Sequence, residues 1–140
     1  MRRVVITGVG MCSPFGFGVK HCWERLINSE SGIDTLKGFE IEDLPSKVGG
    51  QLDKSGNKNL FLENILNVKE SRKTETFIQY ALSAAKEAIN DSGWLPSDQY
   101  KSSRTGVMIG SGIGGLDGIR KSAENLSKGP RTVSYTHLRA

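Results

Sequence analysis

Two short apolar runs lie far apart in the chain, and each leads into glycine. Residues 4–6 are a β-branched Val-Val-Ile run followed by Thr7-Gly8, and residues 106–110 read GVMIG. Short continuous runs of this kind are typical of strands buried on both faces of a sheet. We therefore expect one strand over residues 4–6 and a second over residues 107–109.

Apolar residues recur at helical spacing in three longer stretches. The clearest is TETFIQYALSAAKEAINDSG, residues 74–93, where an apolar stripe faces a mostly polar side. Thr74 is the expected N-cap of this helix and Gly93 its C′ residue, and its many alanines favour close packing against a sheet or another helix. The same spacing predicts helices over residues 19–27, with Gly32 as the stop, and over residues 116–126.

The order of these elements predicts the fold class. Residues 32–60 alternate short apolar pieces with Gly, Lys, Asp and Asn, and we interpret them as loops with one short strand near Lys47–Val48. The resulting order is strand, helix, loop region, helix, strand, helix, which indicates an α/β fold. A length of 140 residues suits a single domain.

Composition narrows the classes of function. The net charge of +4 is mild and dispersed, and aromatic residues are not interleaved with the cations, which argues against a nucleic-acid partner. No stretch approaches the roughly 20 apolar residues that span a bilayer, and the start MRRVVITGVG is a poor signal peptide. We therefore expect a cytoplasmic protein that does not bind membranes. Cys12 and Cys22 lack metal-ligand spacing, and His21 and His137 lie too far apart to suggest a metal site.

The segment GSGIGG, residues 110–115, raises the question of a bound nucleotide. Gly110, Gly112 and Gly115 satisfy the G-x-G-x-x-G spacing between a predicted strand and a predicted helix. The acidic residue expected about 20 positions later is absent, because residues 133–135 read VSY. We favour the alternative that small residues let the backbone pass close to a neighbouring helix or an apolar ligand.

Five segments, taken in order, carry a family resemblance. They are RRVVITGVGMCSPFG, WERLINSESGI, RKTETFIQYALSAAKEAINDSG, RTGVMIGSGIGGLDG and KGPRTVS, between residue 2 and about residue 134. Together they resemble the β-ketoacyl-acyl carrier protein synthases of bacterial type II fatty acid synthesis, and most closely the elongating synthase II type. Five ordered motifs are far more specific than one glycine pattern.

The resemblance implies a thiolase-like α/β fold, of which this chain would form only an incomplete N-terminal half, and a homodimer. It also implies a decarboxylative Claisen condensation. An acyl chain moves from acyl carrier protein to a cysteine, and malonyl-loaded carrier protein then supplies the attacking carbanion. Such chemistry needs an activated thiolate and donors aimed at the thioester oxygen, and we expect no cofactor and no metal.

The chain departs from the family pattern towards its end. It stops before the family's nucleophile motif and both catalytic histidines, so we assign no catalytic residue and expect this chain alone to be inactive. Cys22 lies in an apolar helical stripe and Cys12 in the first loop, where packing is the favoured role of each. We expect residues 1–134 to be a partial β-ketoacyl synthase N-terminal domain and residues 135–140, YTHLRA, to be a non-native tail.

Two sets of residues are candidates for binding. Three cations lie in KESRK, residues 69–73, just before the longest predicted helix. A solvated helix start is the simpler interpretation, although cations oppose the helix dipole there. The resemblance implies that Lys69, Arg72 and Lys73 contact the acidic carrier protein. It also implies that Ile113 lies at the acyl pocket near the dimer interface, and a contact with the partner subunit is the alternative role.

Three functions follow from these features. The first is the N-terminal part of a 3-oxoacyl-[acyl-carrier-protein] synthase in fatty acid elongation, which accounts for most of the sequence and which we favour. The second is a nucleotide-dependent oxidoreductase that uses the loop Gly110–Gly115. The third is a non-catalytic module that binds carrier protein through the three cations.

Overall fold

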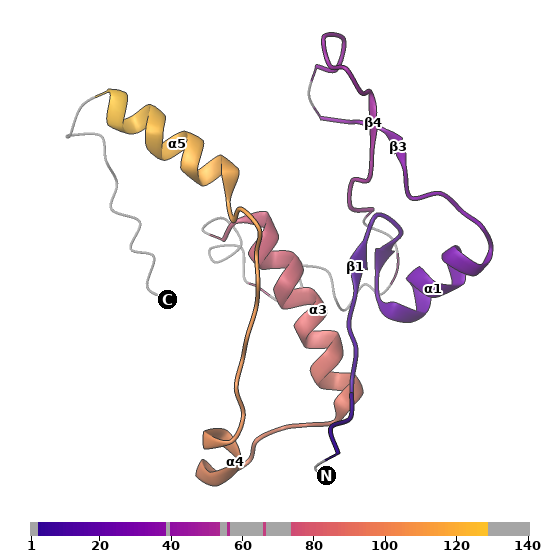
Figure 1. Cartoon of the computed structure of the whole chain (residues 1–140), viewed down its shortest axis with the longest axis vertical. Helices are drawn as coiled ribbons and strands as arrows, with labels where there is room; N and C mark the ends of the chain where they lie inside the picture. The colour runs from indigo at the N-terminus through magenta and orange to yellow at the C-terminus, as the bar shows by residue number, and fades with distance from the viewer. Residues whose placement is uncertain (1–2, 39, 54–55, 57–65, 67–73, 129–140) are drawn as a thin grey trace.

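The computed structural model describes residues 3–38, 40–53, 56, 66 and 74–128. Within these residues the fold combines helices with very short strands (Figure 1). The two strand pairs are both antiparallel, β1 with β2 and β3 with β4. In chain order the elements are β1 (Cys12–Ser13), β2 (Gly16–Phe17), α1 (Val19–Ile27), β3 (Asp34–Thr35), β4 (Val48–Gly49), α3 (Thr76–Ser92), α4 (Gln99–Ser103) and α5 (Leu116–Ser127).

In the view of Figure 1, helix α3 lies between two extended segments, residues 3–11 and residues 105–109. Both segments run in the direction opposite to α3 and are therefore parallel to each other. Helix α3 ends as predicted, with Gly93 in the left-handed conformation at a φ of 64°. The predicted N-cap is one residue off, because Glu75 and not Thr74 occupies the N-cap position.

The first extended segment is held to α3 by carboxylates. The backbone amide of Val9 donates to Asp91 Oδ2 at 3.0 Å, and that of Met11 donates to Glu87 Oε2 at 2.9 Å. The two carboxylates are four residues apart on α3, so they lie on one face of the helix. Side chains of α3 thus supply the acceptors that a neighbouring strand would supply in a sheet.

Glycine makes this approach possible. A Cβ on Gly10 would overlap the carbonyl oxygen of Ala84, and a Cβ on Gly8 would lie 2.6 Å from the amide nitrogen of Ser92. Both neighbours are backbone atoms of α3 that cannot turn aside. The close packing predicted from the alanines of α3 is therefore present, although its partner is an extended segment.

The buried centre lies where the β1–β2 hairpin, α1 and α3 meet. Phe17 and Cys22 are 3% and 2% exposed, and Ser83 of α3 is fully buried, with its hydroxyl donating to the carbonyl of Gln79. Glu87 links the three elements, because its second oxygen, Oε1, accepts the amide of Val19 at the start of α1 at 2.8 Å. A single carboxylate of α3 therefore fixes both the segment before the hairpin and the helix after it.

The two predicted strands are wrong. Residues 4–6 and 107–109 form no strand, and their apolar side chains are exposed, with Val4 at 92%, Ile6 at 86% and Met108 at 99%. A strand requires a neighbour to pair its backbone groups. Among the described residues neither segment has such a neighbour.

The remaining predictions concern shorter features. The helices over residues 19–27 and 116–126 are confirmed, as is the strand near residues 47–48, which is part of β4. Helix α1 ends at Ile27 with Asn28 as its C-cap, well before the predicted stop at Gly32. The apolar stripe of α5 is exposed, because Leu116, Ile119 and Leu126 all face solvent.

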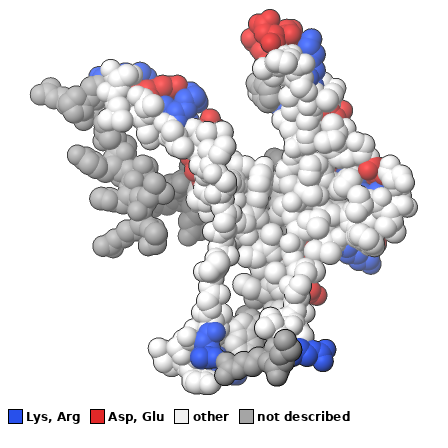
Figure 2. Space-filling model, in the orientation of Figure 1, with Lys and Arg blue, Asp and Glu red and all other residues white. Residues whose placement is uncertain are grey.

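Charged residues lie mostly at the outer ends of the face shown in Figure 2, and uncharged residues cover its middle. No helix among the described residues combines the length and the apolar character needed to cross a bilayer.

We predict that Gly10→Ala weakens the fold, because the new Cβ would overlap the α3 backbone. Overpacking of this kind lowers the free energy of unfolding by about 1–3 kcal/mol. The measurement is urea unfolding at low protein concentration, with Gly106→Ala as the matched control because a Cβ there meets nothing within 4 Å. Equal midpoints for the two variants would contradict the close approach of the segment to α3.

Candidate functional site

The glycine loop, residues 110–115, joins the second extended segment to α5. Its turn is held by Ser111, whose Oγ accepts the amide of Gly114 at 3.1 Å. Ile113 lies at the outside of this turn and is 69% exposed. A Cβ on Gly110 or Gly112 would meet nothing within 4 Å. Among the described residues no helix therefore passes close to these two glycines, and the other expected neighbour, an apolar ligand, stays a prediction.

The far end of the loop meets the start of α3. A Cβ on Gly115 would lie 2.7 Å from Cδ of Glu75 and 2.9 Å from its Oε2. Gly115 is the N-cap of α5 and has no side chain to cap it. The carboxylate of Glu75 therefore occupies the space beside the helix N-terminus, where the partial positive charge favours an anion.

The position of the Glu75 carboxylate argues against a nucleotide bound at the loop Gly110–Gly115. In a dinucleotide site the pyrophosphate lies at the N-terminus of the helix that follows the glycine loop. Here a negatively charged side chain of the chain itself is already at that position, and it would repel a phosphate. The geometry thus argues against the loop Gly110–Gly115 as a pyrophosphate site.

The three cations predicted to contact the carrier protein, Lys69, Arg72 and Lys73, lie outside the described residues. Their role stays a prediction. Of the predicted binding residues, Ile113 is the one whose position is described.

Neither cysteine has the surroundings of a nucleophile. Cys22 is buried, and its sulfur lies 3.2 Å from Ser13 Oγ and 3.4 Å from the carbonyl oxygen of Gly16. The Cys12 thiol is half-buried and contacts the carbonyl of Tyr80 on α3 at 3.5 Å. Burial, reinforced by the charge of Glu87, raises the pKa of Cys12 to about 11. The predicted packing role is consistent with the burial of Cys22 and with the raised pKa of Cys12, because a nucleophilic cysteine needs a lowered pKa.

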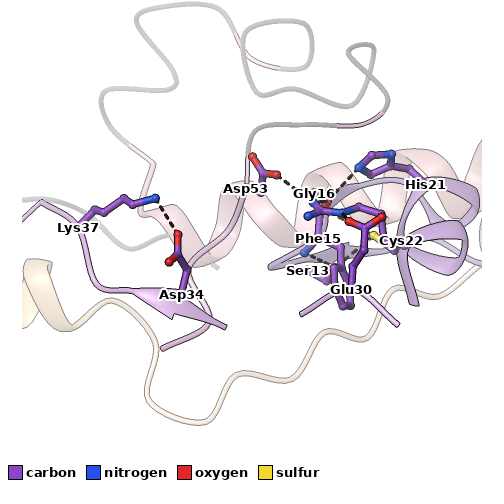
Figure 3. A network of polar contacts seen from close by, with 10 residues as sticks. Ser13, Phe15, Gly16, His21, Cys22, Glu30, Asp34, Lys37 and Asp53 are labelled. Atoms are coloured by element: carbon purple, nitrogen blue, oxygen red, sulfur yellow. Dashed lines mark hydrogen bonds and ion pairs between the residues drawn. The ribbon is translucent and has the colours of Figure 1, made fainter. Parts of the chain in front are cut away.

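Arg25, near the end of α1, organises a polar network that the sequence pattern did not reveal (Figure 3). Its Nη1 donates to the carbonyl of Phe15 at 2.9 Å and to Asp53 Oδ2 at 3.1 Å, and its Nε donates to Glu30 Oε2 at 2.6 Å. The guanidinium carbon also lies 5.4 Å from the centre of the Phe15 ring. One side chain therefore holds the hairpin turn, the end of α1 and the segment after β4 together.

His21 contributes to the same network. Its Nε2 lies 2.9 Å from the carbonyl oxygen of Phe15. Because a carbonyl only accepts, Nε2 carries the hydrogen in this contact. No group of three His, Cys, Asp or Glu side chains that could hold a metal ion occurs among the described residues.

A cavity of about 680 Å³ lies between the Arg25 network and the β3–β4 pair. Its charged lining residues are paired with opposite charges: Arg25 with Glu30 and Asp53, and Asp34 with Lys37 at 2.9 Å. The cavity therefore presents balanced charge, and its lining selects neither an anion nor a cation. We assign it no ligand.

The sequence signals of these features differ. The Arg25 network joins residues up to 28 positions apart, and the contact of Glu75 with α5 joins the starts of two helices some 40 residues apart. The sequence indicates only that Arg25 is a cation in the last turn of a predicted helix, which is a favourable position for a positive charge. It does not indicate the partners of Arg25. No local pattern could identify Glu75.

Comparisons with known proteins place this chain beside one family. Residues 1–137 match the model of the β-ketoacyl synthase N-terminal domain. The chain is 44% identical over 137 residues to a 3-oxoacyl-[acyl-carrier-protein] synthase 2 of Rhizobium meliloti, which covers 96% of the chain and 32% of that relative. It is 41% identical over 144 residues to a putative mitochondrial 3-oxoacyl-[acyl-carrier-protein] synthase of Schizosaccharomyces pombe, covering 96% of the chain and 33% of that relative.

A third relative gives the same result. The 3-oxoacyl-[acyl-carrier-protein] synthase 2 of Vibrio cholerae is 40% identical over 134 residues, which cover 95% of the chain and 31% of that protein. The chain thus spans about a third of the length of the relatives that it matches.

We predict that Cys12 reacts slowly with iodoacetamide in the folded chain. With a pKa of about 11, the thiol at pH 8 is protonated far more completely than an ordinary cysteine, and its alkylation rate should keep rising with pH until the pH reaches about 11. After allowance for the higher nucleophilicity of a more basic thiolate, alkylation should be about tenfold slower than in urea. Mass spectrometry of timed samples measures both rates. Equal rates with and without urea would contradict the packing role.

Proposed function

Because the chain belongs to the β-ketoacyl synthase family, we propose that it forms the N-terminal part of a 3-oxoacyl-[acyl-carrier-protein] synthase of the elongating, synthase II type. The observation that carries the proposal is the match to the N-terminal domain model over residues 1–137, together with 44% identity to a synthase 2. The complete enzyme would condense an acyl group held on a cysteine with malonyl-acyl carrier protein and release carbon dioxide.

The fold that we propose for the complete enzyme is thiolase-like. Its layered α/β halves place helices against strands that run parallel to one another. The two extended segments on either side of α3 in Figure 1, residues 3–11 and 105–109, run parallel to each other. Their exposed apolar residues support the proposal, because strands of this composition are normally buried on both faces.

In the complete enzyme the residues of this chain would bind the carrier protein and position the acyl group, and residues outside this chain would carry out the bond-making steps. Cys12 and Cys22 lack the environment of a nucleophile, and the family resemblance puts the reacting cysteine and both histidines outside the matched residues. We propose that Lys69, Arg72 and Lys73 attract the acidic carrier protein and that Ile113 borders the acyl chain. The exposure of Ile113 on a tight turn supports this role, because an apolar ligand or a partner subunit would cover it.

We also propose that the enzyme is a homodimer in the cytoplasm. The apolar stripe of α5, formed by Leu116, Ile119 and Leu126, is exposed next to the loop that bears Ile113. A continuous apolar face of this kind supports burial against another protein surface. A second subunit would bury it and complete the acyl pocket.

The proposed function is tested with a chimera in which residues 1–134 replace the aligned segment of the Rhizobium meliloti relative. We predict that the chimera makes 3-oxoacyl-acyl carrier protein from acyl- and malonyl-loaded carrier protein. The double variant Arg72→Glu/Lys73→Glu should raise the KM for carrier protein about tenfold, because two attractive contacts become repulsive. The kcat at saturation should change little.

The control is Lys20→Glu, which reverses an exposed cation on α1. An unchanged KM in the double variant at low and high salt would remove the docking role of the two cations. Carrier-protein binding without condensation would favour the non-catalytic module. A soluble chimera with neither binding nor turnover would contradict the proposed function.

A further inference from the structure

We propose that Glu75 is a positioning residue that fixes the loop of residues 110–115, and with it Ile113, relative to α3. The inference rests on the proposed function, because its consequence for activity is a choice of acyl chain length made at Ile113. Its structural part, a link between the N-termini of α3 and α5, stands on the contacts of Glu75 alone.

The backbone of Glu75 is anchored in α3. Its carbonyl oxygen accepts the amides of Ile78 at 3.1 Å and Gln79 at 3.2 Å, as befits the N-cap of that helix. The Gln79 side chain also donates to the carbonyl of Thr74 at 2.6 Å. These hydrogen bonds fix the backbone of Glu75, so α3 sets the direction in which the Glu75 side chain leaves the helix.

The side chain of Glu75 lies against the first turn of α5 and does not cap its own helix, α3. It makes no capping hydrogen bond to α3. Instead, its Oε1 fills the space where a Cβ on Gly118 would be, and its Cδ lies 3.3 Å from that position. Together with the contact at Gly115, this places the carboxylate along the first turn of α5. Only residues without a side chain leave room for it there.

The electrostatics favour this arrangement. The N-termini of two helices carry partial positive charge and would repel each other at close range. The negative charge of Glu75 lies between them, where both helix dipoles stabilise it, and Asp117 adds a second carboxylate in the first turn of α5. A Phe77 contact next to it, 3.9 Å from where a Cβ on Gly114 would be, adds an apolar boundary to the same junction.

Because the loop is short and tightly turned, fixing Gly115 against Glu75 also fixes the position of Ile113. Ile113 is two residues before Gly115, and the Ser111–Gly114 hydrogen bond keeps the intervening turn tight. Ile113 is thus bracketed by that turn on one side and by the Glu75 contact on the other. Removing the Glu75 side chain should release the loop, while Gly106→Ala, at an open position outside the loop, should not.

The structural test is a double-variant cycle in the 140-residue chain, read from amide hydrogen exchange of α5. In a helix interior, Gly→Ala normally raises stability by about fivefold in the closed-to-open ratio. At Gly118 the new Cβ would displace the Glu75 side chain. We therefore expect Gly118→Ala to raise the closed-to-open ratio of α5 about threefold less in the wild-type background than in the Glu75→Ala background. An equal gain in the two backgrounds would overturn the proposed link.

The functional test uses the chimera and the ratio of kcat/KM for short and long acyl chains. We expect Glu75→Ala to reduce this discrimination by about threefold or more, since the loop is released, and Glu75→Gln, which keeps the shape, to retain most of it. Gly106→Ala, outside the loop and with nothing within 4 Å of the new Cβ, is the control and should leave the ratio unchanged. Discrimination that is unaffected by Glu75→Ala would overturn the positioning role.

A separate variant distinguishes failure of the inference from failure of the proposed function. Ile113→Phe should shorten the accepted chain if Ile113 borders the acyl group. If Ile113→Phe changes the preference and Glu75→Ala does not, the positioning role is wrong while the pocket role stands. If neither changes it, or the chimera is inactive, the pocket role fails, and the exchange cycle still decides whether Glu75 joins the two helices.

Discussion

The structure depends on two carboxylates of α3 that hold a strand-like segment without a strand beside it. Glu87 and Asp91 are one helical turn apart, about 6 Å along the axis, and the amides of Val9 and Met11 are two extended residues apart, about 6.7 Å. The two repeats match closely enough for both hydrogen bonds to form at 2.9–3.0 Å. Gly8 and Gly10 alternate with these amides and allow the backbone to lie against the helix. The hairpin and α1 follow from this attachment, because Glu87 also accepts the first amide of α1.

The three longer helices, α1, α3 and α5, could be predicted from the sequence, whereas the five-residue helix α4 was not predicted, and the packing between the helices could not be predicted either. The apolar spacing of residues 76–92 and 116–127 is local, so a single window of sequence contains it. The strands over residues 4–6 and 107–109 were expected from equally clear runs, but strand formation depends on a neighbour elsewhere in the chain. The glycines show the same limit: a close approach to a helix or an apolar ligand was expected in the loop Gly110–Gly115, and the close approach to a helix backbone occurs at Gly8 and Gly10. The backbone that approaches a glycine belongs to a segment far away in the sequence, so a local pattern does not identify it.

The candidate site divides in the same way. Residue type and burial identified the two cysteines as packing residues, and the motifs of residues 2–134 led to the family that the comparisons support. The motif at Gly110–Gly115 suggested a nucleotide, and only the position of Glu75 explains why an anion would not bind there. Arg25 and Glu75 each join segments far apart in sequence through one charged side chain. Such residues become visible only when the fold has brought their partners together.

The attachment of the N-terminal segment to α3 is tested most directly by residue-resolved amide hydrogen exchange over residues 8–11. The account predicts alternation: the amides of Val9 and Met11 are protected, whereas those of Gly8 and Gly10, which have no such acceptor among the described residues, exchange quickly. Asp91→Asn should reduce protection at Val9 more than at Met11. Uniformly fast exchange through all four residues would contradict the account, because the segment would then not be held by the carboxylates of α3.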